Sequence, residues 1–358
     1  MTRRQIGAAM RTTGLALAMI GLGVAALAPA ATAQTLMNGA GATFPYPIYS
    51  KWFDEYTKVD PSVRFNYQSI GSGGGIRQIG ERTVDFGASD GPMTDDQIKK
   101  APAELLHIPT VLGAVVATYN LPGNPTLRFS GEILADIFLG KITSWDDERI
   151  KALNPGVSLP KTAIIVVHRS DGSGTTYIWV DYLCKISKEW EEKAGRGTSV
   201  KWPAGLGGKG NEGVAGQIKN TPGALGYVEL AYAVTNKLPV ALVKNAAGKF
   251  IEPTIATTTA AAAGAASNMP ADFRVSLTNA PGDSAYPIAS FTWLLVYKDQ
   301  PNEAKGRLLT KFLWWAIHDG QKYASDLLYA PLPAPVVKQI EAKVTQITFN
   351  GKPLLAAR

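Results

Sequence analysis

Cysteine and histidine are scarce in this chain of 358 residues, which contains one cysteine and three histidines. Cys184 has no partner for an internal disulfide, and we expect its side chain to face the core. The histidines, His107, His168 and His318, are too scattered to match the spacing of metal ligands. The composition therefore excludes a disulfide-based fold and predicts no metal site.

Runs of basic residues are also missing from the sequence. The formal net charge is +7, and it falls to +4 when residues 1–33 are removed, because they carry three arginines and no acidic residue. A nucleic-acid-binding domain would instead show clustered lysine and arginine. We therefore expect no nucleic-acid partner.

An apolar stretch of small residues lies near the start, at residues 15–28. It follows a basic segment and precedes Ala-Thr-Ala at 31–33, which is the pattern of a cleaved export signal. A retained membrane helix is the alternative, but the stretch is short for a span of about 20 residues. We predict that residues 1–33 are a signal peptide and that the rest is exported as a soluble protein. The residue directly after the cleavage site is Gln34 and not a cysteine, so no lipid anchor is expected.

The densest group of charged, hydroxyl and glycine residues is RSDGSGT at 169–175. The apolar, β-branched residues before it, 163–167, predict a strand, and residues 176–186 predict a helix. The first turn of a helix has free N–H groups at the positive end of its dipole. Glycines allow a ligand to approach the backbone, and Arg169 adds a planar set of donors. This strand, turn and helix therefore predict an anion-binding site.

A simpler interpretation of the same stretch remains open. Ser173 or Thr175 could only cap the helix, while Arg169 forms an ion pair on the surface. The anion-binding interpretation is favoured because the chain repeats the arrangement, at residues 36–45 and again at 63–76. Each repeat runs from a strand through a glycine-rich turn into a helix.

Asp90 follows a short strand candidate and precedes Gly-Pro, where an aspartate is commonly a turn residue. The alternative is a buried acceptor beside the donor-rich turns. A carboxylate next to an oxyanion requires a ligand that carries a proton, as phosphate does near neutral pH and sulfate does not. Two buried acceptors that face each other without a proton between them are unfavourable. A buried Asp90 beside the ligand would therefore exclude sulfate.

Two glycine-rich segments resemble nucleotide-binding loops only superficially. Residues 71–76 break the G-x-G-x-x-G pattern at Ile76, and residues 205–210 lack the serine or threonine that follows lysine in a P-loop. A nucleotide site is therefore not expected.

Two long apolar strand candidates, 108–119 and 288–297, enclose a block of alternating strands and helices. This pattern is typical of an α/β protein, and the length suits two domains. We expect two lobes joined by two hinge crossings. The expected boundaries are 34–120 together with 286–358 for lobe I, and 121–285 for lobe II.

Three further segments are expected to be helical. Ile48, Trp52 and Tyr56 recur at helical spacing, and the apolar residues 312–317 predict a helix whose two tryptophans lie in the core. The alanine-rich residues 256–267 predict a surface helix or a loop.

Seven segments together resemble the periplasmic phosphate-binding proteins of phosphate ABC transporters, the PstS family. The resemblance covers nearly all of the chain after residue 33, in order. The segments are residues 39–45 (GAGATFP), 71–75 (GSGGG), 85–90 (DFGASD), 139–145 (LGKITSW), 169–175 (RSDGSGT), 202–211 (WPAGLGGKGN) and 222–229 (PGALGYVE).

This resemblance implies a two-lobed periplasmic-binding-protein fold of type II, in which each lobe is a mixed sheet flanked by helices. It implies a monomer that captures inorganic phosphate between the lobes and delivers it to the permease subunits of an ABC importer, without enzymatic activity or a cofactor. The implied phosphate ligands are Ala42, Thr43, Phe44, Ser72, Asp90, Arg169, Ser173, Gly174 and Thr175, with Asp90 as the acceptor and Asp171 holding Arg169 in place.

Two other functions remain as alternatives. A binder of sulfate, molybdate or an organic phosphate would give Asp90 no role. An exported phosphatase would use Ser72 or Ser173 as its nucleophile, but it would need a base or a metal, and the chain has no G-x-S-x-G elbow.

Overall fold

The computed structural model describes residues 34–263 and 268–355. The expected signal peptide, 1–33, lies outside the described residues. The described part contains a mixed sheet of eight strands in the order β2-β1-β3-β11-β4-β8-β6-β7. The strands are β1 (Thr35–Gly41), β2 (Val63–Ser69), β3 (Phe86–Ser89), β4 (Leu105–Tyr119), β6 (Ile165–Arg169), β7 (Leu206–Gly208), β8 (Ala224–Glu229) and β11 (Ala289–Tyr297).

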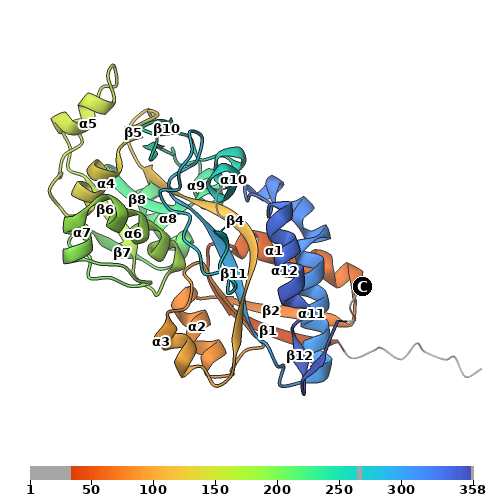
Figure 1. The fold of residues 1–358 in the computed structure, drawn as a ribbon. Helices are drawn as coiled ribbons and strands as arrows, with labels where there is room; N and C mark the ends of the chain where they lie inside the picture. The colour runs from red at the N-terminus through yellow and green to blue at the C-terminus, as the bar shows by residue number, and fades with distance from the viewer. Residues whose placement is uncertain (1–33, 264–267, 356–358) are drawn as a thin grey trace, which may run out of the picture. The chain divides into compact units, whose positions relative to one another are not determined.

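Strand β4 is shared by two halves of this sheet (Figure 1). From Leu105 to Ala114 it pairs antiparallel with β11, and from Val115 to Tyr119 it pairs antiparallel with β8. We call β2, β1, β3 and β11 the first half-sheet, and β8, β6 and β7 the second half-sheet. All residues of β4 are buried, as expected for a strand enclosed on both faces.

Parallel pairing sets the direction of most other strands. In the first half-sheet β1 runs parallel to β2 and β3, and in the second β6 runs parallel to β7 and β8. Two small sheets complete the strands. They contain β5 (Arg128–Phe129), β9 (Leu242–Lys244) and β10 (Phe250–Ile251), and β12 (Thr348–Phe349) with β13 (Lys352–Pro353).

Helices connect the strands, so the predicted α/β class is confirmed. The α-helices are α1 (Tyr46–Val59), α2 (Ser72–Gly80), α3 (Asp95–Lys100), α4 (Gly131–Phe138), α5 (Glu148–Leu153), α6 (Gly174–Ile186), α7 (Lys188–Lys193), α8 (Gly210–Asn220), α9 (Leu230–Thr235), α10 (Ile255–Ala263), α11 (Glu303–Ile317) and α12 (Ala334–Val344). Two 3₁₀ helices, η2 (Asp319–Tyr323) and η3 (Ser325–Leu327), follow α11.

Aromatic packing holds α1 and α11 on the first half-sheet, where Figure 1 shows both beside β1 and β2. The predicted stripe of Ile48, Trp52 and Tyr56 is buried on α1. Nearby, the ring of Phe312 on α11 lies 4.6 Å from that of Phe65 on β2, measured between centroids. Aromatic pairs of this kind add to the free energy gained from burial. These contacts fix where α1 begins, next to the end of β1.

Most of the remaining expectations for single segments are confirmed. Cys184 is buried, and so is Trp315, whereas Trp314 is only half buried and its ring packs on that of His318. The alanine-rich segment is helical over α10, but its expected position at the surface needs correction. Thr258, Ala261 and Ala262 are buried, because α10 packs against β4 and β11.

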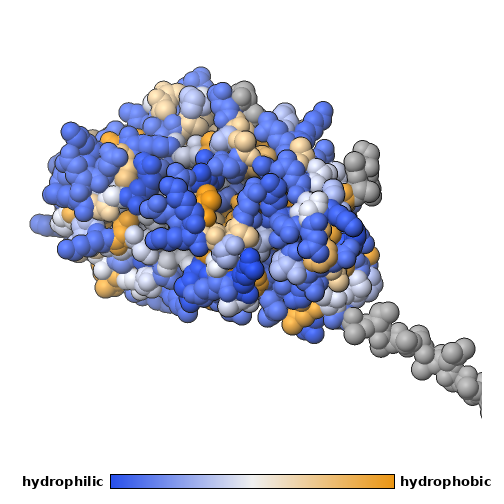
Figure 2. Space-filling view, turned by 60° about the horizontal axis from the view of Figure 1, so that its bottom comes forward, coloured by the Kyte–Doolittle hydropathy of each residue, from blue (hydrophilic) through white to orange (hydrophobic). Residues whose placement is uncertain are grey.

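The face drawn in Figure 2 is mainly hydrophilic, and its apolar residues lie in small separate groups. Within the described residues, the exposed large apolar side chains are spread over four elements: Leu36 on β1, Tyr46 and Val59 at opposite ends of α1, Leu206 on β7 and Val234 on α9. Within the described residues, every helix is too short or too polar to cross a membrane.

Candidate functional site

Four helices begin close together, each just after a strand has ended. Helices α1, α2 and α6 follow β1, β2 and β6, as the sequence predicts, and α8 follows β7 as a fourth. Ligands of α/β sheets bind at such carboxyl ends of strands. The N-terminal amides and dipoles of four helices therefore point donors toward one region.

Arg169 and Asp171 form a doubly hydrogen-bonded ion pair in this region. Nε of Arg169 donates to Oδ1 of Asp171 at 2.8 Å, and Nη2 donates to Oδ2 at 2.6 Å. The amide of Gly210 also donates to Oδ1, at 3.0 Å. Burial opposes ionisation of Asp171, but these donors outweigh it and hold its pKa below the usual value. Because Arg169 is only 3 % exposed, the interpretation as a surface ion pair is wrong.

Asp90 is a buried acceptor, with only 1 % of its surface exposed. Its Oδ1 accepts a hydrogen bond from Oγ1 of Thr292 on β11 at 2.9 Å, and its Oδ2 lies 3.4 Å from Oγ of Ser72. Burial raises the pKa of Asp90 to about 7, although the Thr292 hydroxyl and the charge of Arg169 partly offset this effect. A carboxyl with this pKa is poised between its two protonation states near neutral pH.

Ser72 and Gly174 join the starts of α2 and α6. The amide of Gly174 donates to Oγ of Ser72 at 3.0 Å. A Cβ atom added at Gly174 would overlap Oγ of Ser72 and lie 2.5 Å from Oδ2 of Asp90. Only glycine permits this close approach.

Asn211, at the start of α8, connects the two half-sheets through one amide group. Its Nδ2 donates to Oγ1 of Thr43 at 2.8 Å and to Oγ1 of Thr175 at 3.0 Å. Nη1 of Arg169 also donates to Oγ1 of Thr175, at 3.3 Å. Sequence reasoning missed Asn211 as a site residue. The available signals were its position directly after the glycine-rich residues 205–210 and its place at the end of the segment 202–211 that carries the family resemblance.

Ala42, Thr43 and Phe44 form the turn between β1 and α1. The amide of Ala42 donates to the carbonyl of Ala88 at 3.0 Å, so it continues the pairing of β1 with β3. The amide of Phe44, in contrast, pairs with no acceptor among the described residues. The structure therefore leaves the Phe44 N–H available to a ligand and uses Ala42 to shape the turn.

Ser173 is the N-cap of α6, because its Oγ accepts from the amide of Thr176 at 3.0 Å. The interpretation of Ser173 as a helix cap is therefore confirmed, but it does not exclude a contact with a ligand. A hydroxyl that accepts one hydrogen bond still carries a proton that it can donate. Capping and donation to a ligand are compatible at this residue.

Together, the predicted site residues form a group of hydrogen-bond donors with one carboxyl acceptor, Asp90, among them. Such a set suits a small oxyanion that carries at least one proton. The ring of His168 stacks on that of Trp202 with centroids 4.7 Å apart, and its Nδ1 lies 3.0 Å from the carbonyl oxygen of Arg169. Within the described part of the chain, no three His, Cys, Asp or Glu residues are placed to hold a metal ion.

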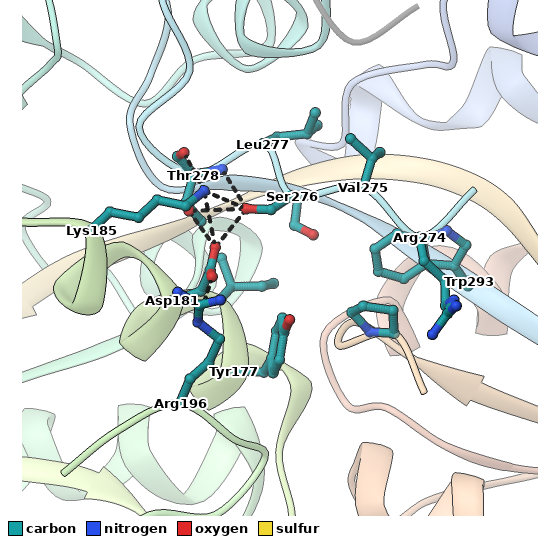
Figure 3. A pocket seen from close by; sticks show the side chains of 13 residues that line it. Tyr177, Asp181, Lys185, Arg196, Arg274, Val275, Ser276, Leu277, Thr278 and Trp293 are labelled. Carbon is teal, nitrogen blue, oxygen red and sulfur yellow. Dashed lines mark hydrogen bonds and ion pairs between the residues drawn. The ribbon is translucent and has the colours of Figure 1, made fainter. Parts of the chain in front are cut away.

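A separate cavity of about 140 Å³ lies between α6 and residues 274–278 (Figure 3). Lys185 and Arg196 both pair with the buried carboxylate of Asp181 there. Arg274 lies across the cavity and pairs with carboxylates of its own, Asp95 and Asp272. The three cations of this cavity are thus balanced by three carboxylates, those of Asp181, Asp95 and Asp272.

Comparison with protein families gives a match to the PBP superfamily domain over residues 28–319. Two relatives named "Phosphate-binding protein PstS" are both 47 % identical to this chain. The one from Xylella fastidiosa (strain Temecula1) aligns over 87 % of this chain and 85 % of its own length. The one from Pasteurella multocida (strain Pm70) aligns over 90 % and 94 %.

Solved structures share the fold at low sequence identity. A high-affinity periplasmic phosphate-binding protein (PfluDING), solved with phosphate bound, has a TM-score of 0.69 at 21 % identity, over 90 % of this chain and 100 % of its own. A putative phosphate ABC transporter substrate-binding protein from Clostridium perfringens has a TM-score of 0.62 at 16 % identity, over 84 % and 100 %. These matches confirm the predicted periplasmic-binding-protein fold with its two lobes.

Proposed function

Because this chain belongs to the PstS family of phosphate-binding proteins, we propose that it captures inorganic phosphate at the site around Arg169 and Asp90 and delivers it to an ABC-type importer. The family and its names support phosphate as the ligand. The geometry of the buried groups supports the same ligand independently, since it combines anion donors with a proton acceptor.

The observation that carries the proposal is the position of Asp90 among the donors. Arg169, the hydroxyls and the helix amides attract an anion, whereas the Asp90 carboxylate repels one unless it meets a ligand hydroxyl. Monohydrogen and dihydrogen phosphate supply that hydroxyl, and sulfate does not. We assign the contacts to Thr43, Phe44, Ser72, Asp90, Arg169, Ser173, Gly174 and Thr175, with Ala42 shaping the turn and Asp171 holding Arg169.

We further propose that the two lobes close on the ligand about β4 and the entry into β11. Lobe I would comprise residues 34–120 with 286–358, and lobe II residues 121–285. The support for this division is that the site residues come from both half-sheets, which several hydrogen bonds join directly. Closure would give the permease one composite surface that signals a loaded protein.

The remaining assignments follow from this role. The protein would be exported to the periplasm, would act as a monomer and would need no cofactor, with the permease subunits as its partners. It would bind its ligand without chemical change. The relatives, which are named as binding proteins, support a non-enzymatic role.

Titration calorimetry of the purified protein with phosphate, sulfate, molybdate and an organic phosphate tests the function. We expect tight binding of phosphate and no measurable binding of sulfate. Sulfate or molybdate bound as tightly as phosphate would overturn the assignment. Release of p-nitrophenol from p-nitrophenyl phosphate, lost in Ser173→Ala, would instead establish the phosphatase.

A further inference from the structure

Glu229 is a buried acidic residue outside the proposed set of ligand contacts. It is the last residue of β8 and the N-cap of α9, and its side chain is 0 % exposed. Its Oε2 accepts from the amide of Ala231 at 2.9 Å. Its Oε1 is buried and has no hydrogen-bond partner within the described residues. An anion left in this state would be costly, so the arrangement needs an explanation.

The hydroxyl of Tyr329 provides the explanation, because it has two oxygen neighbours but only a single proton to donate. It lies 2.6 Å from the carbonyl oxygen of Phe44 and 3.2 Å from Oε2 of Glu229. A carbonyl can only accept, so the shorter contact takes the tyrosine proton. The contact with Glu229 is then a hydrogen bond only if the carboxyl provides the proton. The second hydrogen bond therefore needs a proton on the carboxyl of Glu229.

The surroundings of Glu229 also favour its protonated form. Burial raises its pKa well above the usual value, and the negative charge of Asp90, beyond β3, raises it further. The amides of Leu230 and Ala231 act in the opposite direction without overcoming burial. Tyr232, on α9, is the other titratable group that interacts electrostatically with Glu229, and burial keeps it neutral as well. Among the described residues, no cation is one of the main influences on the pKa of this carboxyl.

We propose that Glu229 is a neutral carboxylic acid that donates its proton to Tyr329, and that it is a positioning residue for the ligand-binding turn at Thr43 and Phe44. This inference rests on the proposed function and adds a residue to it. Glu229 reaches the turn by two routes, and both end on a backbone carbonyl of that turn.

The first route fixes the carbonyl of Phe44 through Tyr329. The second runs through α9, which Glu229 caps, to Tyr232, whose hydroxyl donates to the carbonyl of Thr43 at 2.6 Å. In a trans peptide the N–H points opposite to the C=O. Holding the Thr43 carbonyl therefore aims the N–H of Phe44 to the other side of the turn, where it is free for the ligand.

Phosphate titrations of Glu229→Gln, Glu229→Ala and Tyr329→Phe test the proposal. An amide preserves the shape and can donate to Tyr329, so Glu229→Gln should keep the affinity within about threefold, whereas Glu229→Ala and Tyr329→Phe should each weaken it about tenfold. Tyr323→Phe is a matched control, because it also removes a hydroxyl that lies 3.2 Å from a carboxylate, Glu55, and its affinity should not change. Glu229→Gln as weak as Glu229→Ala would overturn the proposal, as would full affinity in Tyr329→Phe.

Infrared spectroscopy gives a second readout, which does not depend on affinity or on the folding of the alanine variant. With phosphate bound at about pH 8, the wild type should show the C=O stretch of a protonated carboxylic acid, and Glu229→Gln should lack that band. An identical carboxylic-acid region in both proteins would refute the neutral state. Failure of the wild type to bind phosphate would count against the proposed function, whereas normal binding with no difference between variants would refute only the role of Glu229.

Discussion

Oγ of Ser72, in the first turn of α2, accepts a hydrogen bond of 3.0 Å from the amide of Gly174, in the first turn of α6. The two residues are 102 positions apart in the chain and belong to helices that follow strands of different half-sheets. A second direct contact lies beside the first, since the amide of Gly73 donates to the carbonyl of Gly172 at 2.9 Å. In this structure, the two sides of the site are therefore in direct contact.

Gly174→Ala should block this contact. The added methyl group would overlap Oγ of Ser72 and approach Asp90, so we expect phosphate affinity to fall by more than about 100-fold, as several charge-assisted contacts are lost. Small-angle scattering should also show no compaction when phosphate is added. Gly216→Ala is the control, because its methyl group would meet no atom within 4 Å. Normal compaction in Gly174→Ala would contradict the model of closure.

Asn211→Ala should weaken binding without unfolding the protein. The change removes the Nδ2 donor to Thr43 and Thr175 and the Oδ1 acceptor for the amide of Glu229, so we expect affinity to fall at least about tenfold, in line with three lost hydrogen bonds. Calorimetry measures the loss. Asn220→Ala, at the other end of α8, is the control, because its side chain contacts only the carbonyl of Gly216. Equal affinities of the two variants would remove Asn211 from the site.

Asp90→Asn should relax the discrimination between phosphate and sulfate. The amide can donate a hydrogen bond where the carboxylate only repels, so sulfate gains a partner and phosphate loses its acceptor. Sites whose buried polar groups need a matching group on the ligand can discriminate between two ligands by a factor of about 10⁴–10⁵. We expect the variant to lose most of this preference for phosphate over sulfate. Competition titrations with both anions give the ratio directly. A variant that still rejects sulfate would show that another group sets the selectivity.

The stability of the ligand-free protein should depend on pH through Asp90. Its pKa is raised from 3.8 to about 7 in the folded state, so the folded state binds the proton more tightly than the unfolded chain. The resulting stabilisation is complete below about pH 4 and is lost as pH rises to about 7, on the order of 4 kcal/mol in total. Thermal unfolding from pH 4 to 8 should therefore show Asp90→Asn gaining stability relative to the wild type. A constant difference between the two proteins would contradict this.

Arg169→Lys should be far from conservative. Lysine keeps the charge but cannot form the paired hydrogen bonds that Asp171 accepts from Nε and Nη2. We expect phosphate affinity to fall by at least about 10-fold, because the cation is no longer held at one position. Calorimetry at low and high salt checks this, with Arg149→Lys, on the exposed α5, as the control. Equal affinity for Arg169→Lys and the wild type would mean that charge alone is sufficient.

The parts of the site that lie next to each other in the chain were predictable from the sequence. The turns before α1, α2 and α6 each combine glycine and hydroxyl residues after an apolar strand, and that pattern depends only on local geometry. The ion pair of Arg169 with Asp171 is likewise local, since its partners are two positions apart.

The parts that depend on tertiary contact were not predictable from the sequence. Thr292 contacts Asp90 across 202 positions, and Asn211 contacts Thr43 across 168. Both contacts follow from strand order and register, which the local pattern of apolar residues does not specify. Glu229 was hidden for another reason, because its position within an apolar strand gives no sign that its carboxyl meets Tyr329.

The continuity of β4 limits how the molecule could be divided for experiments. Since one strand completes both half-sheets, neither lobe can be produced alone with all of its own hydrogen-bond partners. A fragment that keeps β4 would carry a long apolar edge, and a fragment without it would expose the neighbouring strand. Exposed edges of this kind recruit other chains and aggregate. Separate expression of the two lobes should therefore fail, whereas co-expression of complementary fragments offers a route to reassembly.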